Sequence, residues 1–228
     1  MSSSDAHALS PAHEADRQRH LAHHFDTMDT QEYAVRLAMW LFLGTEVLLF
    51  AGLFLGYTVY RHFYHETFHE ASRTLSIVLG TTNTIVLITS SLTVALAYWA
   101  VKTGKNGLGA FLLVVTILCA CGFLVIKGFE YHHKFEEGML PGQFYHYAEI
   151  TGPGANLYFT IYFLTTGLHA FHVIVGMSVL IWVLARLLKG HFSPGYYYPV
   201  ELGALYWHLV DLVWIYLFPL LYLVGKPE

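Results

Sequence analysis

The sequence predicts an all-α, polytopic membrane protein built as a bundle of five transmembrane helices. The chain of 228 residues is 55% hydrophobic and only 12% charged, whereas a soluble domain carries about 25% charged residues. Its mean hydropathy is +0.47, and its apolar residues form long blocks without the alternation of a membrane β-barrel. Because backbone groups in lipid must be hydrogen-bonded within their own segment, each such block is expected to be a helix.

Five apolar blocks reach the length of roughly 20 residues that a transmembrane helix needs. They cover about residues 35–60, 75–101, 108–131, 156–187 and 202–224. The fourth block is the longest, which indicates a tilted helix or one that extends beyond the bilayer. In the first block, Gly52 and Gly56 have the spacing that lets two membrane helices approach closely. The third block ends near Lys127 and Glu130, which are three residues apart and suitably spaced to pair.

Composition divides the chain into two regions. Residues 1–32 form a polar, histidine-rich segment that cannot bury enough apolar surface to fold alone, so we expect a mobile tail. Residues 33–228 form the five-helix transmembrane domain. Lys and Arg near the helix ends are more numerous on the side of the N-terminus, and the positive-inside rule therefore places the N-terminus in the cytoplasm.

Glu46 lies close to the centre of the first apolar block, where an ionised carboxylate costs about 2.5–3.5 kcal/mol on insertion scales. We therefore expect a protonated carboxyl group, or one that is hydrogen-bonded to a neighbouring helix. Position alone leaves two interpretations open. One is a structural hydrogen bond between helices, and the other is a carboxyl group linked to proton movement.

Histidine and acidic side chains recur at helical spacing in the last two blocks. His169 and His172 share a helix face, as do His208 and Asp211, and Glu201 falls on nearly the same stripe as His208. Haem ligation is one interpretation, because haem iron takes axial ligands from protein side chains such as histidine. The close spacing within each pair argues against a haem on each histidine. We therefore favour contacts that fix the packing of the fourth and fifth helices, with no metal on this chain.

Four motifs, in this order along the chain, resemble subunit III of the haem–copper oxidases, the family of cytochrome c oxidases and quinol oxidases. The resemblance covers about residues 33–225, and it is the combination of motifs that makes it specific. The motifs are Trp40 to Glu46 with Phe50-Ala51-Gly52, Lys127-Gly128-Phe129-Glu130-Tyr131, Gly167 to Val173, and Glu201 with Tyr206 to Trp214.

The resemblance implies a non-catalytic subunit III of a haem–copper terminal oxidase, an oxidoreductase complex of the bacterial inner (cytoplasmic) membrane. It implies subunits I and II as partners, haem and copper in those partners, no cofactor on this chain and no nucleic acid. It further implies support of proton uptake and of stability during oxygen reduction, and bound membrane phospholipid. The alternatives are a subunit of a quinol oxidase or nitric oxide reductase, or a membrane b-type cytochrome.

The resemblance also implies roles for single residues. Glu46 falls on the family's buried carboxyl group that reacts with carbodiimides, and Arg36 falls on an arginine associated with lipid phosphate. Lipid binding is expected of Arg36, Glu46 and His208. Intramembrane polar packing is expected of Glu130, His169, His172, Glu201, His208 and Asp211. The outer faces of the first three helices are expected to dock on the larger partner.

Overall fold

The computed structural model describes residues 19–147, 149–152 and 154–223, and it confirms the all-α fold. Expectations for residues 1–18 and 224–228 lie outside the described residues. Within the described part, five helices are long and apolar enough to cross a membrane. Their bounds are Met28–Phe63 (α2), Ile77–Lys102 (α4), Asn106–Glu136 (α5), Ala155–Leu188 (α6) and Tyr198–Phe218 (α7). A π-helical turn, Pro219–Leu223 (η2), continues α7.

Helix α2 begins well before the first apolar block. The side chain of Thr27 accepts a hydrogen bond from the backbone N–H of Thr30 at 3.2 Å, which is the contact of a helix N-cap. The boundary that the sequence placed at residue 32 therefore lies inside α2. Before the cap, the ring of His20 stacks on Tyr196 with 3.7 Å between ring centroids. This part of the expected tail thus contacts the loop between α6 and α7.

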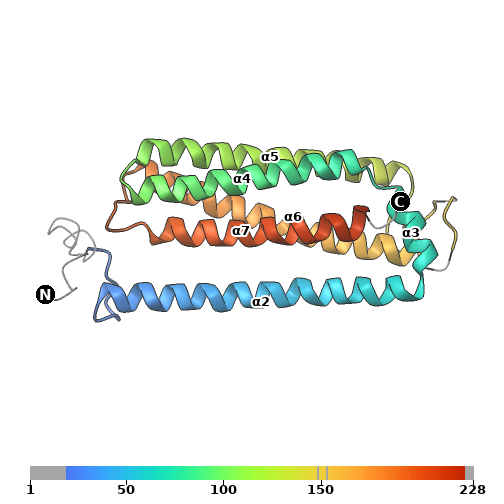
Figure 1. Cartoon of the computed structure of the whole chain (residues 1–228), viewed down its shortest axis with the longest axis horizontal. Coiled ribbons are helices and arrows are strands. Elements are labelled where there is room, and N and C mark those ends of the chain that lie inside the picture. The colour runs from blue at the N-terminus through green and yellow to red at the C-terminus, as the bar shows by residue number, and fades with distance from the viewer. Residues whose placement is uncertain (1–18, 148, 153, 224–228) are drawn as a thin grey trace, which may run out of the picture.

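A short helix that hydropathy did not reveal, α3 (His65–Arg73), follows α2. It is polar on its outer side and buries Phe68 and Ala71. Phe68 contacts the rings of Tyr57 and Tyr158, with centroid distances of 5.6 and 5.3 Å. Figure 1 shows α3 at the end of the bundle opposite the N-terminus. We call this end the α3 end. The long loop between α5 and α6 contains a 3₁₀ turn, Gly142–Phe144 (η1).

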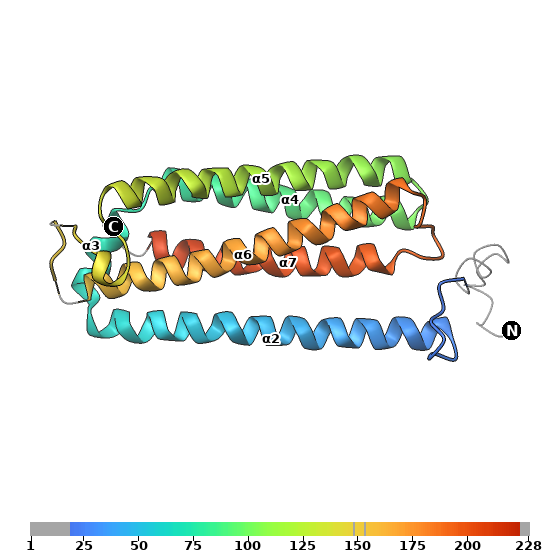
Figure 2. The ribbon, with the colours of Figure 1, turned by 180° about the vertical axis from the view of Figure 1, so that it is seen from behind.

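Helices α4 to α7 form a four-helix bundle, and α2 lies along one side of it, against α7 and α6 (Figure 1). Figure 2 shows α6 running obliquely to α2. In the most apolar stretch of α2 only 11% of the residues are buried, against 56% in the last span. The buried side chains of α2 along the membrane are Leu43, Phe50 and Tyr57, which are seven residues apart. Helix α7 is therefore central, and α2 is an edge helix.

Close helix contacts occur at glycines other than the two predicted. A Cβ atom at Gly52 or Gly56 would meet no described atom within 4 Å, so neither glycine makes a close helix contact within the described chain, and a contact with another subunit stays a prediction. Gly52 is exposed and Gly56 is partly exposed. Instead, a Cβ at Gly176 of α6 would lie 3.0 Å from the indole of Trp207. At Gly80 of α4, a Cβ would lie 2.6 Å from the ring of Phe218.

Candidate functional site

Glu46 of α2 pairs with His172 of α6, between the edge helix and the bundle. Glu46 Oε2 lies 2.8 Å from His172 Nε2, and the two side chains are 15% and 10% exposed. On the other side of the ring, His172 Nδ1 lies 2.8 Å from the carbonyl oxygen of Leu168. Glu46 therefore does hydrogen-bond to a neighbouring helix, and its partner is a histidine.

The two contacts of the His172 ring require one hydrogen at Nδ1 and a second proton shared between Nε2 and Glu46 Oε2. A backbone carbonyl only accepts hydrogen bonds, so Nδ1 must carry hydrogen. Nε2 then either accepts from a protonated Glu46 or donates, as part of an imidazolium, to the Glu46 carboxylate. Both arrangements leave the pair with no net charge. Two ionisable groups thus lie at membrane depth without the cost of an isolated charge.

Arg36 and Glu201 join α2 to the start of α7. Arg36 Nη2 lies 3.0 Å from Glu201 Oε2 and 4.0 Å from Glu32 Oε2. The Arg36 side chain is 41% exposed, so solvent or headgroups also reach it. The sequence predicts Glu201 as a packing residue of α7 but does not indicate Arg36 as its partner.

An apolar groove of about 350 Å³ opens near Arg36, between α2, α6 and α7. Met39, one turn after Arg36, is one of its walls. The complete lining is Met39, Phe42, Val175, Val179, Trp182, Pro199, Leu202, Gly203 and Tyr206. Arg36 is not one of the lining residues, but it precedes Met39 by one turn of α2 and pairs with Glu201, the neighbour of Leu202 in the chain.

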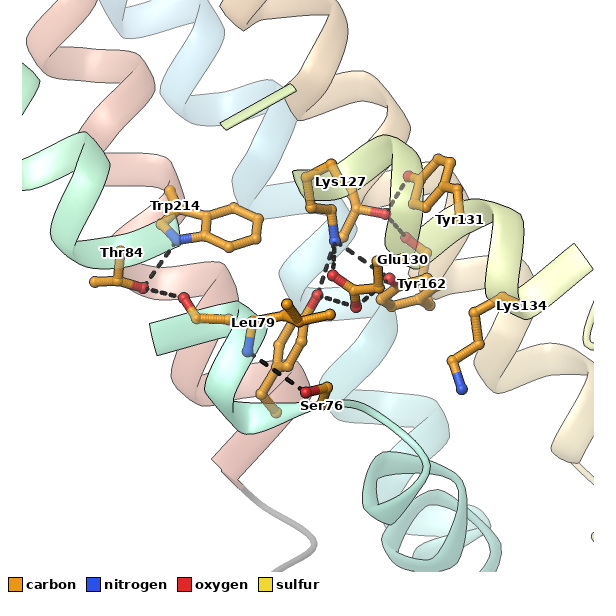
Figure 3. Close-up of polar contacts among 12 residues, drawn as sticks. Ser76, Leu79, Thr84, Lys127, Glu130, Tyr131, Lys134, Tyr162 and Trp214 are labelled. Atoms are coloured by element: carbon orange, nitrogen blue, oxygen red, sulfur yellow. Dashed lines mark hydrogen bonds and ion pairs between the residues drawn. The ribbon is translucent and has the colours of Figure 1, made fainter. Parts of the chain in front are cut away.

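Lys127 and Glu130 of α5 form an ion pair that is buried in the bundle toward the α3 end. Lys127 Nζ donates to Glu130 Oε2 at 3.1 Å, and the two side chains are 4% and 3% exposed. Figure 3 shows both side chains projecting from α5 toward Tyr162 of α6. The sequence suggested this pair but not its burial. Two tyrosines from other elements cover it.

The tyrosines Tyr162 and Tyr222 satisfy the remaining hydrogen-bonding capacity of the pair. Lys127 Nζ donates to the hydroxyl oxygens of Tyr162 at 3.2 Å and Tyr222 at 2.7 Å. Both hydroxyls donate to Glu130 Oε1, at 2.8 and 2.6 Å. All three ammonium hydrogens are used. The cluster thus joins α5, α6 and the turn η2 through a site with no net charge.

Of the residues expected to join α6 and α7, His172 and His208 have their side-chain hydrogen bonds with other helices, whereas the ring of His169 contacts Trp214 of α7. His172 bonds to α2 instead, and His208 Nδ1 lies 2.7 Å from Ser91 Oγ of α4. Asp211 is 6% exposed, and its Oδ1 has no hydrogen-bond partner among the described residues. The reason is the central position of α7, whose polar side chains face α4 as well as α6.

His169 is fully buried beside α7 but makes no polar contact there. Its ring lies between Trp214, at a centroid distance of 5.3 Å, and Phe123, at 5.5 Å. Neither ring nitrogen has a hydrogen-bond partner among the described residues. Among the same residues, no group of three or more His, Cys, Asp or Glu side chains could hold a metal ion. His169 contributes to the α5–α6–α7 interface as an aromatic ring.

The last turn of α5 and the loop after it contribute polar contacts at the α3 end. Lys134 Nζ donates to the carbonyl oxygen of Thr74 at 2.8 Å and to Glu137 Oε2 at 3.1 Å. Further along the loop, Tyr147 donates its hydroxyl hydrogen to Glu149 Oε2 at 2.5 Å. This hydrogen bond raises the pKa of Tyr147 to about 12.

Comparison with known proteins gives one consistent family. The family model of cytochrome c oxidase subunit III matches residues 17–226. Cytochrome c oxidase subunit 3 of Corynebacterium diphtheriae is 33% identical over 185 residues, which cover 80% of this chain and 84% of the relative. The subunit 3 of Synechocystis sp. is 34% identical over 188 residues, covering 81% of this chain and 73% of the relative.

A longer relative contains a similar segment as part of a fused chain. The haem–copper oxidase subunit I+III of Aeropyrum pernix is 31% identical over 196 residues. The match covers 83% of this chain but only 23% of the relative. The chain therefore spans less than a quarter of that protein.

Proposed function

The chain belongs to the cytochrome c oxidase subunit III family, and on this premise we propose that it works within a bacterial haem–copper terminal oxidase of the cytochrome c oxidase type. The family match over residues 17–226 carries the proposal. In it, the chain docks on subunit I, while subunits I and II hold the haem and copper centres. The name of the Aeropyrum relative, which joins subunits I and III in one chain, supports subunit I as the direct partner.

The proposed location is the bacterial inner membrane, with the N-terminus in the cytoplasm. The short loops at the N-terminal end of the bundle support this orientation, because they and the adjoining helix ends carry Lys102, Lys105, Arg186 and Lys189. Positive charges of this kind favour the cytoplasmic side.

Purification of the tagged chain in mild detergent tests the assignment. We expect haem to appear only together with a larger membrane subunit, and the isolated chain to be colourless. A b-type haem spectrum on the chain alone would show that its histidines are ligands and would refute the proposal. Oxidation of quinol instead of cytochrome c by the purified complex would reassign the oxidase type, and nitric oxide reduction would do the same.

The Glu46–His172 pair is our candidate for the support of proton uptake. The geometry that supports this role is the single proton shared across 2.8 Å between the two side chains. Glu46→Gln separates the two interpretations that the sequence left open, because the amide can donate to His172 Nε2 but cannot release a proton. We expect the variant complex to assemble normally and to take up protons more slowly. Wild-type proton uptake in Glu46→Gln, with loss of assembly in Glu46→Leu, would leave only a structural role.

Carbodiimide labelling gives a second test of the same pair. Carbodiimides react with protonated carboxyl groups in apolar surroundings, so the label is expected at Glu46. Glu201 is the matched control, because it is paired with Arg36 at 3.0 Å and lies near the helix start. A label at Glu201 without one at Glu46 would contradict a protonated Glu46.

We also propose that the groove beside Arg36 holds one acyl chain of a phospholipid, with the phosphate at Arg36. The apolar lining and the 41% exposure of the Arg36 side chain support this site. We place the phosphate at Arg36 because Glu46 bonds to His172 and His208 bonds to Ser91; lipid binding by Glu46 and His208 stays a prediction. Arg36→Gln should lower the phospholipid retained per purified complex. Lys105→Gln at the same end is the control and should retain it; equal retention in both variants would refute the site.

A further inference from the structure

The middle of α7 carries a polar site that opens to the surface of the bundle. His208 Nδ1 lies 2.7 Å from Ser91 Oγ of α4, and Asp211 follows one turn later on α7. His208 is half-buried, so part of its ring reaches the surface. His208 lies ten residues after Tyr198, where α7 begins, which is about 15 Å along the axis and about half of a 30 Å hydrocarbon core.

Hydrogen-bonding capacity at this site is left unused. The contact with Ser91 uses only one ring nitrogen of His208. His208 Nε2 makes no hydrogen bond to any described residue, and Asp211 Oδ1 has none either. Lipid tails offer no donor or acceptor, so such groups at membrane depth are costly unless protein or water reaches them.

Several polar side chains on the described membrane helices are satisfied by other groups of this chain. The Glu46–His172 pair closes on itself at 2.8 Å. The exposed hydroxyls of Thr45, Thr82 and Thr89 each donate to a carbonyl of their own helix at 2.6 to 2.8 Å. Tyr57, Asn83 and His169 also have polar atoms without a partner among the described residues, but these side chains are at most 1% exposed. The site at His208 differs because its free nitrogen belongs to a half-buried side chain.

The apolar side chains around the site are exposed and come from two helices. We define the α4–α7 face as Ile88 and Leu92 of α4 with Leu212 and Ile215 of α7, around Ser91 and His208. The four apolar side chains are 50%, 60%, 49% and 44% exposed, respectively. A stripe of apolar residues around a central polar group is the pattern by which membrane helices associate through packing plus an interhelical hydrogen bond.

We propose that the α4–α7 face binds a transmembrane helix of another subunit, which presents a hydrogen-bonding side chain to His208 Nε2 near the bilayer midplane. This inference rests on the proposed function, in which the partner is the haem-bearing subunit. It revises the expectation that the outer faces of the first three helices dock. The exposed stripe of α5, for example, is apolar at Phe111, Leu118 and Val125 and offers no comparable polar group.

A photo-crosslinking amino acid at Leu212 tests the face in the assembled complex. Leu118 of α5 is the control, because it is 64% exposed but lies outside the face. We expect a crosslink to the haem-bearing subunit from position 212 and only lipid adducts from position 118. A subunit crosslink from position 118, with lipid adducts at 212, would overturn the proposed face while leaving the subunit III assignment intact. Absence of any co-purifying haem-bearing subunit would instead refute the proposed function.

Substitution of His208 tests the hydrogen bond itself. His208→Leu should weaken association with the partner five- to thirtyfold, which corresponds to about 1–2 kcal/mol for an interhelical hydrogen bond in a membrane. His208→Gln keeps a polar side chain and should restore part of the loss. Unchanged association of His208→Leu would overturn the proposed bond. If that variant does not fold, the crosslinks from position 212 still decide the question, because they leave His208 in place.

Discussion

Replacing Tyr222 with phenylalanine should destabilise the helix bundle by about 2–3 kcal/mol. The substitution removes one hydroxyl and leaves the ring, so it creates almost no cavity. That hydroxyl donates to Glu130 Oε1 at 2.6 Å and accepts from Lys127 Nζ at 2.7 Å. Because both side chains are at most 4% exposed, water cannot replace the lost contacts.

The magnitude follows from the two contacts. A hydrogen bond to a charged group contributes about 1.5–3 kcal/mol, whereas interhelical hydrogen bonds measured within a membrane protein average about 0.6 and reach about 1.7 kcal/mol. Because the two hydrogen bonds to charged groups share one hydroxyl oxygen, their combined contribution to stability is smaller than the sum of two separate bonds. Glu130 also keeps the bond from Tyr162, which limits the loss. These bounds give the expected 2–3 kcal/mol.

The measurement is a denaturant titration of the folded chain in mixed micelles, followed by circular dichroism. Tyr158→Phe is a matched control, because Tyr158 is also fully buried but donates to a neutral backbone carbonyl, that of Leu221, at 3.0 Å. It should cost about 0.5–1.5 kcal/mol. Equal losses in the two variants would show that the charged cluster adds nothing beyond an ordinary hydrogen bond and would refute the reasoning.

Three further predictions use the same or simpler measurements. Lys127→Met leaves Glu130 without its cation and should cost about 3–5 kcal/mol, whereas Lys127→Met/Glu130→Gln should cost less than the single variant in the same titration. Gly80→Ala should cost about 1–3 kcal/mol, because its Cβ would lie 2.6 Å from an aromatic ring. Between pH 10 and the Tyr147 pKa of about 12, the folded chain holds a proton that the unfolded chain loses, so this contribution to stability falls as pH rises. Glu149→Gln should return that pKa toward 10, measured by phenolate absorbance.

Hydropathy was sufficient to predict the five helices of the described residues that are long and apolar enough to cross a membrane, and roughly where they lie, because apolar length is the property that such a helix needs. It could not place helix ends, which depend on single capping contacts such as the one at Thr27. It also missed α3, since a short helix that covers the end of a bundle needs only a few buried side chains, here Phe68 and Ala71.

Helical spacing predicted faces but not neighbours, and this limited the prediction of the site. His172 and His208 were correctly placed on helix faces, yet each faces a helix other than the expected one. A helical wheel cannot show that α7 is central and α2 is at the edge. Tyr162 and Tyr222 were missed for another reason. A tyrosine within an apolar run is predicted to be a core side chain, and the neighbouring sequence does not indicate that its hydroxyl will contact a buried ion pair.

The position of α2 illustrates what polar contacts contribute to such a fold. An edge helix gains little hydrophobic free energy by packing against the bundle, because the lipid tails that it would otherwise contact are equally apolar. Gln31, Arg36 and Glu46 nevertheless each bond to α6 or α7, at 2.8, 3.0 and 2.8 Å. They lie five and ten residues apart, about 7.5 and 15 Å along the axis. A slide of α2 by one turn would break all three bonds together, whereas its apolar contacts would exchange with similar neighbours. The three bonds therefore determine the register of α2, and with it the geometry of the Glu46–His172 pair and of the groove beside Arg36.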